Sequence, residues 1–174
     1  MDVALPDFPY GPAVGTIVSG EGASAFREQI ESGQMQQLAS PEGRFGCYGA
    51  SLVTAVDYLH AMRSRGPMRR AWAEMFKKID LLVAPTRATV AYPIDKTFDK
   101  AYPDVRGAAS PIGACNLVGV PAISVPNGFG INNLPTGIQF ISPAWGEPML
   151  FEIGEEYQRR TDWHTKHPPD RANV

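Results

Sequence analysis

The sequence of 174 residues is poor in cysteine and has no excess of basic charge. Its two cysteines, Cys47 and Cys115, lie far apart and have no neighbouring cysteine or histidine at ligand spacing. This argues against a disulfide framework and against a zinc site, so we expect no bound metal. With 16 basic and 18 acidic side chains, the chain has no positive balance to attract phosphates, and we expect no nucleic-acid partner.

Long hydrophobic runs are also missing. The apolar run at 81–85 is far shorter than the roughly 20 residues that cross a bilayer. The N-terminus does not have the charged segment followed by an apolar stretch that is typical of a secretory signal. We therefore expect a soluble cytoplasmic protein with no membrane partner.

Several familiar catalytic and nucleotide-binding motifs do not occur. The sequence contains no Gly-x-Ser-x-Gly, no Ser-x-x-Lys, no Gly-x-Gly-x-x-Gly and no phosphate-binding Gly-Lys-Ser/Thr loop, so we expect no cofactor. Ser124 lies within a predicted strand, and we interpret it as a buried structural residue with no base beside it. We interpret His60, His164 and His167 as non-catalytic, because no further ligand or partner is evident in the sequence.

The composition favours one folded domain, 1–174, in which the chain turns often. Apolar residues make up 44% and charged residues 20%, and there are 17 glycines and 16 prolines. We expect an extended arm at 1–18, a helix at 19–33 and a polar tail at 162–174. We also expect a kinked helix or helical hairpin at 48–79 whose apolar face comprises Leu52, Ala55, Val56, Leu59 and Met62.

The second half of the sequence predicts three strands. The unalternated run 81–85 favours a strand covered on both faces, as in a parallel or mixed sheet. A surface excursion at 86–106 leads to a short helix from Ser110 to Val118, which Gly119 ends. Strands at 122–125 and 137–141 are expected to pair, and a last helix starts at Pro148. The predicted fold class is α/β, with a partial mixed sheet flanked by helices.

Three segments together resemble one known family. They are Asp-Leu-Leu-Val-Ala-Pro-Thr at 80–86, Asn-Leu-Val-Gly-Val-Pro-Ala-Ile-Ser-Val-Pro at 116–126, and Leu-Pro-Thr-Gly-Ile-Gln-Phe-Ile at 134–141. In this order and at these intervals they resemble the C-terminal part of the amidase signature family, over about residues 20 to 160.

The resemblance implies a serine amidohydrolase that converts a carboxamide and water to a carboxylate and ammonia, or passes the ammonia on in a transamidation. Family members use a serine, a second serine joined by a cis peptide, and a lysine, on a segment that has no counterpart in this chain. They are also more than twice as long. The expected function is therefore that of a C-terminal fragment or truncated homologue that is inactive alone and contains no catalytic residue.

The resemblance also implies positions that border the substrate pocket, where a small amide or carboxylate would bind. Arg44 falls near an arginine that binds a substrate carboxylate in some members, although a solvated surface arginine is the plainer interpretation. Thr86 and Asn116 border a strand end and a close-packed helix, and Asn116 could equally satisfy local backbone groups.

Two other functions stay open at this level. One is a non-catalytic module for small-carboxylate binding or assembly, and the other is a subunit completed by a separate chain that carries the serine and lysine. In each case, unpaired strand edges and apolar faces would favour association, so we expect a homo-oligomer or a missing N-terminal half.

Overall fold

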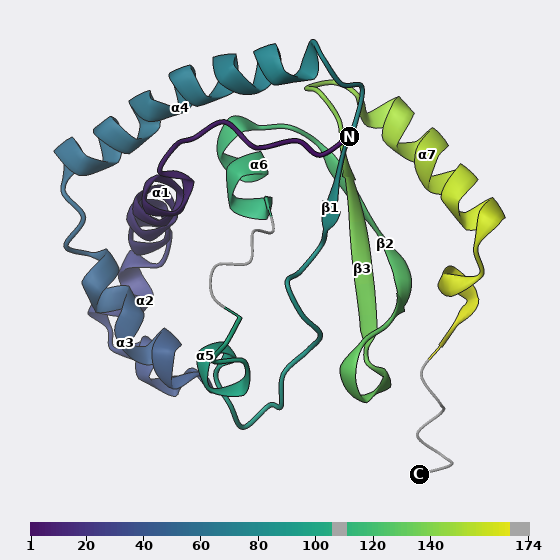
Figure 1. The fold of residues 1–174 in the computed structure, drawn as a ribbon. Coiled ribbons are helices and arrows are strands. Elements are labelled where there is room, and N and C mark those ends of the chain that lie inside the picture. The colour runs from purple at the N-terminus through teal and green to yellow at the C-terminus, as the bar shows by residue number, and fades with distance from the viewer. Residues whose placement is uncertain (106–110, 168–174) are drawn as a thin grey trace.

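The computed structural model describes residues 1–105 and 111–167, apart from the side chains of residues 41, 42 and 99. Helices arch around one side of a small sheet, and a further helix lies on the sheet's other side (Figure 1). The elements, in chain order, are α1 (Tyr10–Ala25), α2 (Arg27–Glu31), η1 (Gln34–Gln37), α3 (Pro41–Ala50), α4 (Ala55–Phe76), β1 (Leu82–Pro85), α5 (Phe98–Ala101), α6 (Ile112–Val118), β2 (Ala122–Phe129), η2 (Ile131–Asn133), β3 (Pro135–Ile141), α7 (Glu147–Arg160) and η3 (Trp163–Thr165).

The sheet has the strand order β1-β3-β2, and both pairings are antiparallel. The expected pairing of 122–125 with 137–141 is confirmed, and both strands are longer than predicted, with an irregularity between Pro126 and Gly128. The α/β architecture is confirmed as well, although the sheet within the described residues is antiparallel throughout rather than mixed. The expectation that the first strand is covered on both faces is wrong for Val83, whose side chain is 49% exposed because β1 forms an edge of the described sheet.

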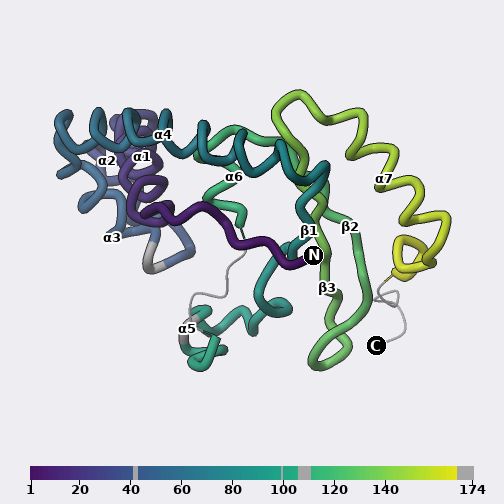
Figure 2. Tube along the Cα trace, turned by 45° about the horizontal axis from the view of Figure 1, so that its top comes forward, coloured from purple at the N-terminus to yellow at the C-terminus, as the bar shows by residue number. Residues whose placement is uncertain are grey.

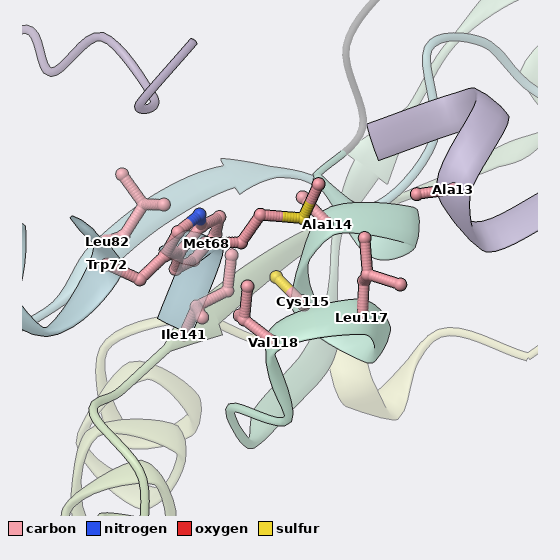
Figure 3. Close-up of a cluster of buried hydrophobic side chains, with 9 residues drawn as sticks. All are labelled: Ala13, Met68, Trp72, Leu82, Ala114, Cys115, Leu117, Val118 and Ile141. Atoms are coloured by element: carbon pink, nitrogen blue, oxygen red, sulfur yellow. The ribbon is translucent and has the colours of Figure 1, made fainter. Parts of the chain in front are cut away.

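Each face of the sheet packs against a different set of helices. Helix α7 covers one face through a cluster whose buried members are Val125, Phe140 and Leu150. The other face meets α1, α4 and α6 in the main core, where Trp72 and Met68 are almost fully buried (Figure 3). Because side chains alternate along a strand, this second face also carries the polar positions of β2 and β3 that are described below.

The N-terminal segment is largely helical rather than extended. Helix α1 begins at Tyr10, so the prediction of an extended arm is wrong for residues 10–18, and only the residues before Tyr10 run as an arm along the core (Figure 2). Pro12 is compatible with this start because the first helical turn needs no backbone N–H donor. Packing of Ala13 and Val14 in the main core favours the helix.

The predicted helical region at 48–79 is divided differently. Helix α3 ends at Ala50, and α4 then runs for 22 residues with Pro67 inside it. The buried residues of α4 are Ala61, Met68 and Trp72, of which Met68 and Trp72 belong to the main core. The predicted apolar face does not form as one helix face, because Leu52 lies in the turn before α4, and Leu52 and Val56 are 80% and 76% exposed.

The ends of the last helices follow the sequence signals closely. Gly119 ends α6 with φ of 75°, a left-handed conformation that glycine adopts without strain. The predicted start of this helix at Ser110 lies outside the described residues.

Helix α7 starts at Glu147, one residue before the predicted Pro148. Near its end, Glu156 forms ion pairs with both Arg159 and Arg160.

In the tail, Trp163 packs edge-on against Phe129 of β2, which places η3 beside the sheet. Across residues 1–105 and 111–167, the structure contains no helix with the length and apolar character needed to cross a membrane.

Candidate functional site

A pair of hydroxyl groups lies over the middle strand of the sheet. The Oγ1 of Thr86, just after β1, and the Oγ of Ser124, on β2, are 2.6 Å apart. Between these two strands lies β3, and a Cβ atom added to its Gly137 would fall 2.9 Å from Thr86 Oγ1 and 3.2 Å from Ser124 Oγ. Glycine at this position therefore allows the two hydroxyls to meet across the sheet.

Ser124 is exposed, so the expectation that it is buried in its strand is wrong. The alternation of β2 places it on the polar part of the sheet, while its neighbours Ile123 and Val125 pack toward α7.

Gln139 extends this polar surface along β3. Its side chain is 4% exposed, and its Nε2 donates to the Pro85 carbonyl over 2.9 Å. The Thr86 backbone N–H in turn donates to the Gly137 carbonyl over 2.9 Å. The end of β1 is thus fixed to β3 by one hydrogen bond from the Gln139 side chain and one to the Gly137 backbone.

A groove of about 570 Å³ opens beside Thr86. This volume lies within the ~300–1,000 Å³ that is usual for small-molecule sites. Its lining combines hydroxyl, cationic and aromatic side chains: Thr86, Arg87, Thr89, Tyr92, Phe98 and Thr136.

The three residues singled out from the sequence lie in different parts of the fold. Thr86 lines the groove, whereas Arg44 and Asn116 are not among its described lining residues. Arg44 lies on α3 and its Nε donates to the Leu38 carbonyl over 2.6 Å. Asn116 is exposed on α6. Binding roles for these residues stay predictions.

Nucleophiles with a neighbouring base are not found in the described part of the chain. The Ser64 and Ser142 hydroxyls donate to the Ala61 and Pro143 carbonyls. Burial raises the pKa of the Cys115 thiol to about 11, which keeps it protonated at neutral pH. The same residues also contain no cluster of three or more side chains able to hold a metal ion.

Comparison with known proteins identifies the family of this chain. The family model described as Amidase matches residues 31–151 of the chain. The chain belongs to the amidase signature family. A glutamyl-tRNA(Gln) amidotransferase subunit of Chloroflexus aurantiacus is 32% identical over 190 aligned residues, which cover 97% of the chain and 39% of that protein. The corresponding glutamyl-tRNA(Gln) amidotransferase subunit of Acinetobacter baumannii is 38% identical over 109 residues, or 63% of the chain and 22% of the relative.

Solved structures share the fold of this chain. A chain from a vestigial protein complex linked to the origins of an s-triazine catabolic enzyme matches with a TM-score of 0.76 and 23% identity, over 91% of the chain and 35% of its own length. A crystal structure of an amidase gives a TM-score of 0.74 at 20% identity, over 91% of the chain and 37% of its own length. These likenesses show the fold, and the chain spans less than two fifths of the length of each relative.

Sequence reasoning missed Arg87, Gly137 and Gln139. The strand alternation could have placed Gly137 and Gln139 on one face, because they are two residues apart. Nothing in the local pattern indicates that Arg87 lines a groove, because residues 86–98 enclose one only together with the distant residues Pro135, Thr136 and Gly137.

Proposed function

We propose that this chain is the C-terminal portion of an amidase signature amidohydrolase and that it cleaves no amide by itself. It contributes a wall of the amide pocket, while the nucleophile and its base belong to a part of the fold outside this chain. The observation that carries the proposal is the pairing of Ser124 with Thr86, a hydroxyl rather than a base, in a chain that spans 39% of its Chloroflexus relative.

The chemistry of amide cleavage explains why this pairing matters. A serine attacks a carboxamide only when a neighbouring base removes its proton and hydrogen-bond donors stabilise the oxyanion. The Thr86 hydroxyl cannot act as that base at neutral pH. The pair can still orient a bound amide, because each hydroxyl can both donate and accept hydrogen bonds.

The relatives suggest the reaction class of the complete fold. They are named as amidotransferase subunits and as an amidase, so release of ammonia from a carboxamide is the reaction we propose for it. Whether the ammonia goes to water or to an acceptor depends on parts of the fold outside this chain.

An open apolar surface fits the same proposal. Phe45, Leu52 and Val56, on and between α3 and α4, are 67%, 80% and 76% exposed. Exposed apolar side chains of this kind in neighbouring elements are typical of surfaces that another part of a protein covers. We expect the isolated chain to self-associate through this surface.

Amide hydrolysis by the purified chain tests the proposal. We expect no release of ammonia from benzamide or from short aliphatic amides above the buffer rate, and the same result for Ser124→Ala. Ammonia release that phenylmethanesulfonyl fluoride blocks and Ser124→Ala abolishes would overturn the proposal.

A further inference from the structure

The groove beside Thr86 has one charged side chain among its described lining residues, Arg87. Arg87 is exposed, and none of the ion pairs among the described side chains includes it. A guanidinium stays charged at all ordinary pH values, and its planar set of donors matches a carboxylate in a two-point contact. The groove therefore places a permanent positive charge where an anion can bind.

An apolar wall stands in the same groove. The rings of Tyr92 and Phe98 meet edge to face with centroids 6.1 Å apart. Phe98 also packs against Tyr102, whose hydroxyl donates to the Ala91 carbonyl over 3.0 Å and so ties this loop to itself. Val90, which also lines the groove, is 7% exposed. A ligand here would contact aromatic and aliphatic surface as well as a cation.

Hydroxyl groups supply the remaining polar contacts. Thr136 donates its hydroxyl proton to Asn127 Oδ1 over 2.8 Å, so its oxygen can still accept a hydrogen bond. Thr89 contributes a second hydroxyl to the lining. At one end, Thr86 connects the groove with the Thr86–Ser124 hydroxyl pair.

We propose that this groove binds a carboxylate with an apolar or aromatic body, held by Arg87 at its anionic end and by the ring pair Tyr92–Phe98 along its body. Together with the proposed function, on which this step rests, the site also assigns a substrate class to the complete fold. Its substrates are amides that carry a carboxylate remote from the scissile bond. The amide end of such a molecule lies at the Thr86–Ser124 hydroxyl pair. We place the carboxylate at Arg87 rather than at Arg44, because Arg87 lines the groove and Arg44 is not among its described lining residues.

Binding of phenylacetate to the full chain, followed by amide NMR shifts, tests this inference. Phenylacetamide is the matched neutral control because it has the same shape without the charge. We expect saturable binding of phenylacetate with shifts in the 86–98 and 135–137 segments, and binding of phenylacetamide at least about tenfold weaker, as loss of a charged hydrogen bond predicts. Equal binding of the two compounds, or no binding of phenylacetate, would overturn the inference.

Two arginine variants make the assignment specific. We expect Arg87→Gln to weaken phenylacetate binding about tenfold, and Arg44→Gln to leave it unchanged. The reverse pattern would assign the site to Arg44 instead and contradict the inference. Arg87→Gln should unfold at the wild-type temperature, because Arg87 is exposed, whereas Arg44→Gln should unfold slightly earlier, because it loses the hydrogen bond from Arg44 Nε to the Leu38 carbonyl.

The outcome is separable from that of the proposed function, because binding is measured without turnover. Amide hydrolysis by the isolated chain would refute the proposed function and leave carboxylate binding intact. Equal binding of phenylacetate and phenylacetamide would refute the carboxylate site. It would leave the proposed function intact, because that proposal concerns only the lack of amide hydrolysis by the isolated chain.

Discussion

The hydroxyl oxygens of Thr86 and Ser124 lie 2.6 Å apart, above a glycine on the strand between them. This contact spans the width of the three-stranded sheet, because Thr86 follows one edge strand and Ser124 belongs to the other. The position of Thr86, and with it the entrance to the groove, thus depends on the absence of a side chain at Gly137.

Gly137→Ala tests that dependence. The added methyl group would come within 2.9 Å of Thr86 Oγ1, so we expect the free energy of unfolding to fall by about 1–3 kcal/mol, as for other overpacked sites. Urea unfolding measures the change. Thr86→Ala removes the contacted oxygen, so the double variant should lose about 1 kcal/mol less than the sum of the single losses.

Gly15→Ala is the matched control for this substitution. Gly15 is exposed inside α1, and a Cβ atom there would have no neighbour within 4 Å. Alanine should stabilise the helix by about 0.5–1 kcal/mol. A loss at Gly15 as large as that at Gly137 would show that crowding over the sheet is not the cause.

A hydrogen bond in the main core gives a second prediction. Trp72 is 1% exposed, and its Nε1 donates to the Tyr10 hydroxyl over 2.8 Å. Tyr10→Phe would leave this buried donor without its partner and would also remove the hydrogen bond from the Tyr10 hydroxyl to the Pro6 carbonyl, which together should cost about 1–3 kcal/mol of unfolding free energy. Tryptophan fluorescence during urea unfolding measures it.

Tyr48→Phe serves as its control, because the Tyr48 side chain is 41% exposed and its hydroxyl accepts only a long 3.5 Å contact from Gln36. We expect a change within about 0.5 kcal/mol. Equal effects of the two substitutions would mean that the Trp72 contact contributes nothing specific.

The buried thiol of Cys115 predicts a loss of stability in alkali. Its pKa is raised from 9.0 to about 11 because burial disfavours the thiolate. Between these values the unfolded chain holds fewer protons than the folded chain, so stability is fully present below pH 9 and falls as the pH rises to about 11, by roughly 2 kcal/mol in total.

Unfolding free energies of the wild type and Cys115→Ala between pH 8 and 11 check this. The variant should be less stable overall, because it loses a buried side chain, but its pH dependence should be shallower. Parallel curves for the two proteins would contradict the assignment.

The exposed apolar surface around α3 and α4 predicts self-association. Light scattering at micromolar concentration should detect a dimer or larger species, and Val56→Asp should shift it toward the monomer, because a charge cannot be buried there without a partner. His60→Asp, also at an exposed position of α4, should have little effect. A wild-type chain that is already monomeric would rule out this surface as an interface.

Local signals predict the elements that depend on few residues. Gly119 ends α6 because its left-handed backbone conformation is one that glycine adopts freely. The pairing of β2 with β3 follows from two short apolar runs joined by a glycine- and asparagine-rich turn. The prediction of an extended N-terminal arm fails because Gly11 and Pro12 are typical of a turn, although proline fits the first turn of a helix equally well.

Features that depend on distant contacts could not be predicted in the same way. Amphipathic spacing groups Leu52 and Val56 on one helix, but Leu52 lies in the turn before α4, and spacing does not show whether anything covers either side chain. The groove joins Arg87 and Phe98 to Thr136, and these segments become neighbours only when β1 has paired with β3.

Mass spectrometry of the chain after reaction with a fluorophosphonate, which labels activated serines, is the most direct measurement of the missing nucleophile. Because Ser124 pairs with a hydroxyl and the sequence has no Ser-x-x-Lys, we predict no covalent adduct on any serine at neutral pH. A stoichiometric adduct on Ser124 would show an activated nucleophile within this chain and would contradict the assignment of catalysis to another part of the fold.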